Sequence, residues 1–329
     1  MTVATAATQS PITAASNRFV AAHLEQASAL GARLAELVAN PDAFVQAMRE
    51  GLGEIADVAY IDGVHSVTPG LGPVLGVRLP LLEAAHKQFR RATKQTPPLL
   101  ILAVTDRLLM DDAADIRWFG MWNLERLLAT HPEQTWELMR CAAREASEWI
   151  SVDTLAHPYA DGILREPRRW SDLQLLVHSP SRWERRLVGS TIAALPHVRR
   201  AGAKDKGVAS RGLMLIGLLI GDADPDVQKS LSWALRSLAP IDPAAVSAFV
   251  EREAATARTT DDGHRAWVLR DALPKLPPET QETLRASLAG VRRRPGVSST
   301  SRAATSAVES ASARAAKRPA HKPGRKSAP

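Results

Sequence analysis

Apolar residues recur along most of the chain at the spacing of one helix face, whereas strand-like alternation is scarce. Leu24, Leu30, Leu34 and Leu37 follow a period close to 3.6 residues, and the pattern stops at Asn40. Runs of β-branched or aromatic residues with a period of two are few, and so are the Asn-Gly and Asp-Gly pairs that favour hairpins. The pattern therefore predicts an all-α protein.

Further helices are predicted wherever apolar positions with this spacing are bounded by Pro, Asp or Gly. One opens at Asp42, and the others cover residues 80–93, 98–110, 115–129, 132–150, 152–164, 170–177, 182–194, 206–220, 225–238, 243–255, 267–273 and 278–288. Short amphipathic helices cannot bury their apolar faces alone, so we expect antiparallel pairs stacked side by side. No strict motif recurs at a fixed period, which predicts a degenerate HEAT-like solenoid over residues 20–290 with a concave binding face.

Three segments fall outside this pattern. We expect residues 1–19 to be a flexible N-terminus. Residues 51–76 contain six glycines and two prolines, which predicts a long loop with at most one helical turn. Residues 291–329 are rich in Ser, Ala, Pro, Arg and Lys and lack aromatic residues, so we expect a disordered tail.

The positive charge is concentrated in that tail. The chain has a net charge of +7, but residues 291–329 carry ten basic residues and one acid, which leaves the remainder at −2. The body is therefore not a generally basic DNA binder. Residues 165–206 nevertheless carry ten Lys or Arg against four acids. This is a local basic patch, and on charge alone the favoured interpretation is a set of solvated helix ends.

Several classes of function find no support in the sequence. The single cysteine, Cys141, excludes an internal disulfide, and the N-terminus lacks the pattern of a secretory signal. The longest apolar run, residues 213–220, is too short to span a bilayer, so we expect a cytoplasmic protein with no membrane partner. The nine histidines lack metal-ligand spacing, and no phosphate-binding glycine loop is present, so neither a metal nor a cofactor is expected.

Tryptophan is the most informative residue type, with eight present against two Tyr. Tryptophan in helical proteins usually belongs to the core, which is our interpretation of Trp118, Trp122, Trp136, Trp170 and Trp267. The other three lie beside charged residues and are candidates for a binding site. They are Trp149, Trp183 and Trp233.

Trp149 and Asp153 lie four residues apart, so on one continuous helix they would share a face. The alternative is that Asp153 caps a helix beginning at Thr154, because Asp is a favoured N-cap residue. Without further information the cap is the more ordinary interpretation.

Two arginines closely follow Trp183, and Trp233 lies between Lys229 and Arg236 in the sequence. Trp183 stands near a helix start before Arg185 and Arg186, whose guanidinium groups could clamp a phosphate. Acidic caps and Pro225 open the helix that carries Trp233. Taken singly, these segments are compatible with ordinary core packing.

Taken together, the order, content and spacing of these segments resemble the HEAT-like-repeat DNA glycosylases of the DNA alkylation repair (AlkD-type) family. The family shows Trp-x-x-x-Asp, then Asn-x-Trp-x-x-Arg, then Gln-Lys-x-x-x-Trp-x-Leu-Arg. The corresponding segments here are Trp149 to Asp153, Trp183 to Arg186, and Gln228-Lys229 to Arg236, with a Gly76-Val-Arg-Leu-Pro80 motif ahead of an early helix. The chain departs from the family in having Ile150 after Trp149 and Ala194 where a lysine sometimes occurs.

The resemblance implies a role for each matching residue. Trp149 and Trp233 would cradle the damaged nucleotide, Asp153 would be the catalytic carboxylate, and Arg186 would contact DNA. The further DNA-binding residues expected from these segments are Trp183, Arg185, Lys229 and Arg236.

The leading hypothesis is a DNA repair glycosylase that removes cationic N3- or N7-alkylated purines from double-stranded DNA, acting as a monomer in the cytoplasm near the nucleoid. A carboxylate near C1′ would stabilise the positive charge that develops on the sugar. One alternative is a noncatalytic HEAT-like module that binds damaged or branched DNA. Another is a helical-repeat protein scaffold without affinity for DNA.

Overall fold

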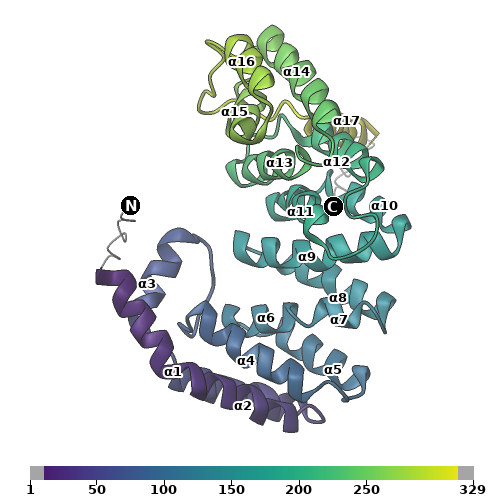
Figure 1. The fold of residues 1–329 in the computed structure, drawn as a ribbon. Helices are drawn as coiled ribbons and strands as arrows, with labels where there is room; N and C mark the ends of the chain where they lie inside the picture. Colours follow the sequence, from purple (N-terminus) through teal and green to yellow (C-terminus); the bar gives the residue numbers. More distant parts are fainter. Residues whose placement is uncertain (1–10, 318–329) are drawn as a thin grey trace, which may run out of the picture. The chain divides into compact units, whose positions relative to one another are not determined.

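The computed structural model describes residues 11–317, and every regular element within this range is a helix (Figure 1). The predicted helical-repeat, all-α fold is confirmed. The first ten residues of the expected flexible N-terminus lie outside the described residues, while residues 11–19 belong to the first helix. None of the helices within 11–317 has the length and apolar character required to cross a bilayer.

The chain divides into two compact units, Met1–Gly162 and Ile163–Pro329, which are described separately. The helices of unit 1 are α1 Pro11–Glu36, α2 Pro41–Glu54, α3 Val58–Val67, α4 Leu79–Ala92, α5 Pro98–Leu109, α6 Ala114–Met121, α7 Leu124–Leu127, α8 Pro132–Glu145 and α9 Trp149–Arg165, which runs past the boundary at Gly162.

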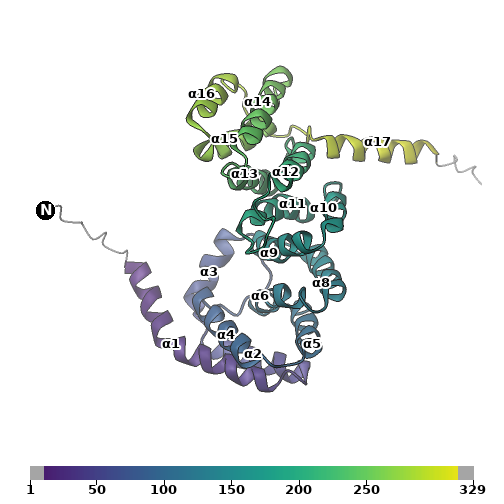
Figure 2. The same ribbon diagram turned by 45° about the vertical axis from the view of Figure 1, so that its right-hand side comes forward.

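Unit 2 consists of helices arranged in two layers (Figure 2). The helices are α10 Trp170–Leu176, α11 Arg182–Ala194, α12 Lys206–Leu219, α13 Pro225–Leu238, α14 Pro243–Thr260, α15 Gly263–Ala272, α16 Pro278–Ser287 and α17 Arg302–Lys317, with short 3-10 turns at Pro167–Arg169, Leu195–His197 and Leu273–Lys275. α11, α13 and α15 pack one after another in one layer, and α12, α14 and α16 form the other. This stacking of successive pairs is how short amphipathic helices bury a common core.

Aromatic side chains from separate helices form the core of unit 1. Phe44, Phe89 and Phe119 are fully buried, with ring centroids 5.5 to 6.4 Å apart. α1 packs against α4 at Gly31, where an added Cβ would lie 2.0 Å from the carbonyl oxygen of Ala85. A side chain at this position would therefore separate the two helices.

The prediction of a loop over residues 51–76 is wrong in its first half. α2 continues to Glu54, and α3 forms nearly three turns from Val58 to Val67. The Asp57 side chain caps α3 by accepting a hydrogen bond from the N–H of Ala59, 3.1 Å away, and Val64 is buried. Gly63 faces open space, so its missing side chain leaves no packing defect. Glycine content was therefore a misleading signal in this segment.

Part of the segment expected to be disordered, residues 291–301, makes specific contacts with the rest of unit 2. Thr300 donates its N–H to Gly221 O, 2.8 Å away, and Arg293 Nη1 donates to Gln228 Oε1 at 3.0 Å. His264 Nε2 lies 2.9 Å from Val297 O, and Ser301 is 1% exposed. These anchors are polar, whereas the compositional argument considered only apolar burial. Residues 318–329 of the predicted tail lie outside the described part of the chain.

We expect Gly31→Ala to lower the free energy of unfolding by about 1 to 3 kcal/mol, because the new methyl group would overlap the backbone of α4. Gly63→Ala is the matched control in the same unit. It should stabilise the protein by up to about 1 kcal/mol, since alanine favours helix and this position is open. Urea denaturation measures both changes, and equal effects of the two substitutions would contradict the close packing of α1 on α4.

His86 should make unit 1 sensitive to acid. Burial lowers its pKa from 6.5 to about 3, opposed by a hydrogen bond with Asn123 and reinforced by nearby arginines. Since the folded-state pKa lies below the unfolded value, stability is complete above pH 6.5 and is lost as the pH falls toward 3. Within that window, each fall of one pH unit should lower the free energy of unfolding by roughly 1.4 kcal/mol.

The measurement compares urea unfolding of the wild type and of His86→Gln at several pH values between about 4 and 7, the range in which His86 should affect stability. The glutamine side chain can still bond to Asn123 but does not titrate. We expect the difference between the two proteins to change steadily with pH. A constant difference would show that His86 protonates equally easily in the folded and unfolded chains.

Candidate functional site

The candidate site begins at a break between α8 and α9. Ala146 is in extended conformation after Glu145, and the Glu148 carboxylate accepts hydrogen bonds from the N–H groups of Ile150 at 2.5 Å and Ser151 at 2.9 Å. This carboxylate caps α9 at its first turn, and burial raises its pKa. The prediction of one continuous helix over residues 132–150 is therefore wrong.

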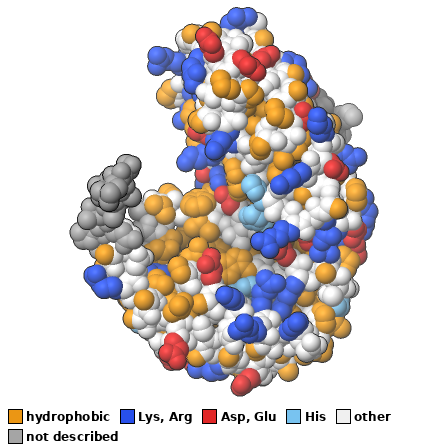
Figure 3. Space-filling model, viewed as in Figure 1, with side chains coloured by type: hydrophobic (Ala, Val, Ile, Leu, Met, Phe, Trp, Pro, Cys, Tyr) orange, Lys and Arg blue, Asp and Glu red, His pale blue; other side chains and the backbone are white. Residues whose placement is uncertain are grey.

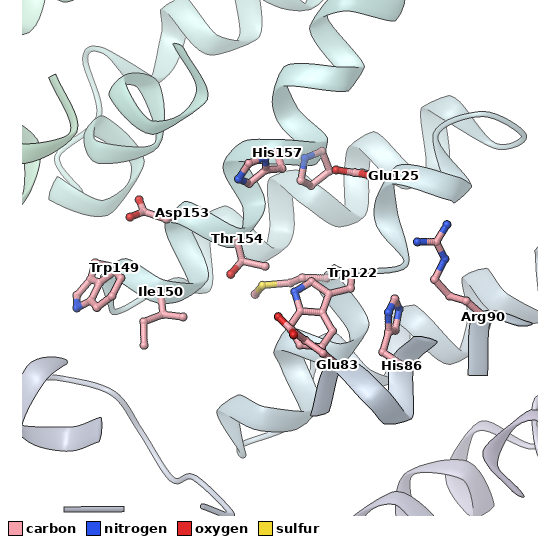
Figure 4. A pocket seen from close by; sticks show the side chains of 12 residues that line it. Glu83, His86, Arg90, Trp122, Glu125, Trp149, Ile150, Asp153, Thr154 and His157 are labelled. Atoms are coloured by element: carbon pink, nitrogen blue, oxygen red, sulfur yellow. The ribbon is translucent and has the colours of Figure 1, made fainter. Parts of the chain in front are cut away.

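The same cap decides between the two interpretations of Asp153. Because α9 begins at Trp149, Asp153 lies inside the helix, one turn after the tryptophan. The alternative that Asp153 caps a helix starting at Thr154 is wrong. Figure 4 shows Trp149 and Asp153 on the same side of α9. The predicted shared face is thus present.

Two indole N–H groups orient α9. Trp149 Nε1 donates to the carbonyl oxygen of Val67 at the end of α3, 3.1 Å away. From the neighbouring α6, the buried Trp118 donates to Ser151 Oγ, also at 3.1 Å. The bond to Val67 fixes the Trp149 ring, and the bond from Trp118 fixes Ser151 on the opposite side of the first turn of α9. Trp149 remains partly exposed.

Trp149 and Asp153 line a pocket of about 530 Å³, which we call the acidic pocket (Figure 4). Its other lining residues are Glu83, His86 and Arg90 from α4, Met121 and Trp122 at the end of α6, Glu125 from α7, and Ile150, Thr154, His157 and Pro158 from α9. Every one of these residues belongs to unit 1.

The acidic pocket combines carboxylates and indole rings. The carboxylates of Glu83, Glu125 and Asp153 line it together with one guanidinium group, that of Arg90. His86 adds no positive charge at neutral pH, because burial lowers its pKa to about 3. Carboxylates and aromatic faces both attract cations. The pocket is therefore suited to a positively charged group.

Sequence reasoning missed most of this lining. Trp122 was predicted to be core, but its ring is partly exposed and lies across the pocket, with its centroid 5.3 Å from that of His86. The predicted helix over residues 115–129 is interrupted after Met121, which brings Trp122 to a helix end. Glu83 and Glu125 are ordinary exposed helix residues in sequence, and nothing marked them. Trp118 and Trp136 are buried as predicted, whereas Trp170 and Trp267 are only partly buried.

The Gly76-Val-Arg-Leu-Pro80 motif holds the segment that leads into α4. Gly76 has φ of +87°, a conformation that favours glycine. The buried carboxylate of Asp115 accepts from the N–H groups of Leu75 at 2.7 Å and Val77 at 3.1 Å, and Arg78 pairs with Asp57 at 2.6 Å. Burial raises the pKa of Asp115 despite these two bonds. The motif thus fixes the start of the helix that carries Glu83, His86 and Arg90.

The predicted residues of α11 are engaged within unit 2. Trp183 is 9% exposed, with the Arg182 guanidinium 4.6 Å from its ring centre. Arg185 Nε lies 2.7 Å from the buried Asp222 carboxylate, and Arg186 Nη1 donates to the carbonyl oxygen of Asp226 at 2.8 Å. These bonds join α11 to the start of α13.

The predicted residues of α13 differ in accessibility. The Asp224 side chain caps the helix, as the acidic segment before Pro225 indicated. Lys229 is exposed, and Trp233 is partly exposed on the third turn. Arg236 Nη1 lies 2.6 Å from the Asp271 carboxylate of α15.

No group of three or more His, Cys, Asp or Glu side chains within residues 11–317 is arranged to hold a metal ion. The acidic pocket is lined by carboxylates, imidazoles and indoles, with the Arg90 guanidinium and the Thr154 hydroxyl beside them.

Comparison with known proteins identifies the family. None of the curated proteins compared with the chain matches it significantly. Residues 48–276, however, match the sequence model of the DNA alkylation repair enzyme family, and this range includes both the acidic pocket and the α11–α13 segments. The match covers more than half of the chain, and it agrees with the resemblance carried by the Trp149, Trp183 and Trp233 segments. The chain therefore belongs to the DNA alkylation repair enzyme family.

Proposed function

We propose that the protein is a DNA glycosylase that hydrolyses the bond between deoxyribose and a cationic N3- or N7-alkylated purine in double-stranded DNA. The observation that carries the proposal is the placement of Trp149 and Asp153 one turn apart on α9, at the acidic pocket. Membership in the DNA alkylation repair enzyme family supports it. We further propose that it acts as a monomer in the cytoplasm.

The charge of the lesion suits this pocket. Alkylation at N3 or N7 makes the purine cationic, so it leaves as a neutral base when the glycosidic bond breaks. Three carboxylates and the rings of Trp122 and Trp149 surround the space where such a group would bind. A cation over an aromatic face gains roughly 0.5 to 2 kcal/mol, which favours the alkylated nucleotide over a neutral one.

The reaction requires one carboxylate near the sugar. As the C1′–N bond breaks, its electron pair leaves with the base, and positive charge develops on the deoxyribose. We propose that Asp153 stabilises this charge and accepts a proton from the water whose oxygen bonds to C1′. Ionised Asp153 is the form that both roles require.

The residues of unit 2 enter the proposal through the family resemblance. Trp233 would be the second indole against the damaged nucleotide, and the exposed Lys229 would contact a phosphate. For Trp183, Arg185, Arg186 and Arg236 we retain DNA contact as part of the proposal. Each of the three arginines also holds a carboxylate or carbonyl group inside the unit.

Asp153→Asn should slow base release by at least about 100-fold, because the neutral amide neither stabilises the sugar cation nor accepts the proton. Release of 7-methylguanine and 3-methyladenine from methylated duplex DNA is followed by mass spectrometry. Glu145→Gln, which removes an exposed charge of unit 1 outside the acidic pocket, is the control and should release base at the wild-type rate.

Two results would contradict the assignment of the reaction. If the pure wild type releases neither base but binds damaged duplexes as well as Asp153→Asn does, the protein is a noncatalytic DNA-binding module. If Asp153→Asn retains the wild-type rate, the carboxylate is not part of the chemistry.

The double substitution Glu83→Gln and Glu125→Gln should reduce the preference for a cationic over a neutral base. We expect the ratio of the two affinities to fall about two- to fivefold, as is typical for exposed charge pairs. Duplexes with one 7-methylguanine or one guanine are titrated by fluorescence anisotropy, with Asp153→Asn present throughout to prevent turnover. An unchanged ratio would show that these carboxylates do not face the base, and Glu145→Gln again serves as the control.

A further inference from the structure

A second pocket of unit 1 holds a partly buried cation without a counterion. The Arg126 guanidinium lies 5.4 Å from the centre of the Phe89 ring, and its Nη1 donates to Thr93 Oγ1 at 3.0 Å. Its Nε and Nη2 are buried and have no hydrogen-bond partner. Within residues 11–317, no carboxylate lies within ion-pairing distance of this side chain.

The neighbouring charges are also positive. Arg126 shares a cavity of about 230 Å³ with Arg90 and Lys94, and the hydroxyl-bearing Thr93, Thr96 and Thr130 line it as well; we call it the basic pocket. Both Arg90 and Lys94 are exposed. Burial, together with the nearby positive charge of Arg90, lowers the pKa of Arg126 to about 10. The guanidinium group is still charged at neutral pH.

Such an arrangement is costly in free energy. Removing a charge from water without pairing it carries a large penalty. Other shielded arginines face acids: Arg185 pairs with Asp222, and Arg265 pairs with Glu253. In the basic pocket no acid fills that role, and three cations surround a space large enough for an anion.

The basic pocket adjoins the acidic pocket. Arg90 lines both pockets. Earlier along α4, Glu83 and His86 line the acidic pocket, and just beyond the end of α4, Thr93 lines the basic pocket. In Figure 3, Lys and Arg side chains gather over the end of α4 and α7, beside apolar surface. A nucleic acid with a cationic base next to phosphate groups carries the opposite charges, positive for the acidic pocket and negative for the basic pocket.

We propose that the basic pocket binds a phosphate group of the DNA backbone close to the damaged nucleotide, with Arg126, Arg90 and Lys94 as its donors. This inference rests on the proposed function for the choice of DNA as the source of the phosphate. Guanidinium groups bind phosphate oxygens with paired N–H bonds, and the threonine hydroxyls at the rim add neutral donors.

The dependence of DNA affinity on salt tests the proposal. Binding of an unmodified duplex is measured by fluorescence anisotropy at several KCl concentrations, and the slope of log K against log [KCl] counts the phosphates that the protein neutralises. Arg126→Met keeps the aliphatic contact with Phe89 and removes the charge. We expect it to weaken binding and to reduce the slope by about 1.

Arg91→Gln is the matched control, because it removes a charge from the next position of α4 but does not line the basic pocket. Arg90→Gln and Lys94→Gln alter exposed side chains, so they provide the same readout if Arg126→Met does not fold. Equal slopes for the pocket variants and for Arg91→Gln would overturn the proposal. Equilibrium binding decides this whether or not the wild type releases a base, so failure of the glycosylase assignment is a separate result.

Inorganic phosphate provides a second, independent readout. Replacing chloride by phosphate at constant ionic strength should raise the Tm of the wild type, and it should raise the Tm of Arg126→Met less, because only the former retains the site. If phosphate protects the wild type but the DNA salt slope does not depend on Arg126, the pocket binds a free anion and the assignment to the DNA backbone is wrong.

Discussion

The Glu148 carboxylate accepts hydrogen bonds from the backbone N–H groups of Ile150 and Ser151, and this cap determines where α9 begins. A start at Thr154, five residues later, would make Asp153 a capping residue bound to backbone amides. With the start at Trp149, the indole and the Asp153 carboxylate lie on successive turns at the same pocket. Burial raises the pKa of Glu148, while the hydrogen bonds from the two backbone amides oppose this rise by favouring the ionised carboxylate.

Unit 1 places two pockets of opposite charge along one helix. α4 contributes Glu83 and His86 to the acidic pocket and leads into Thr93 and Lys94 of the basic pocket, with Arg90 between them. The neutral state of His86 preserves the acidic character of the first pocket, because a protonated imidazole would offset one of its carboxylates. In the described part of the chain no carboxylate pairs with Arg126, which preserves the positive charge of the second pocket. The proposals for a cationic base in the first pocket and a phosphate in the second rest on these two sets of charges.

The segments with the least regular composition are held by specific polar contacts. Asp115 binds the backbone on both sides of Gly76, and Thr300 binds backbone and carboxylate groups of unit 2. Close approach is possible because glycines stand opposite the tail: a Cβ on Gly221 would lie 2.3 Å from Thr300 Oγ1. Such contacts add order without adding apolar residues, and for this reason composition did not reveal them.

The sequence by itself determined the helical fold, most helix positions and the likeness of three tryptophan segments to a repair family. Helices such as α11 and α13 could be predicted because apolar spacing and capping residues are local signals, and α11 begins and ends where the pattern indicated. Sequence also marked Trp149 and Asp153 as a pair.

Only the tertiary structure decided that Asp153 does not cap a helix, that Trp122 lies in a pocket rather than in the core, and that Arg126 faces no acid. The physical reason is that these properties depend on groups brought from distant segments. The Val67 carbonyl that holds Trp149 is 82 positions away in the chain, and no local pattern encodes such a contact.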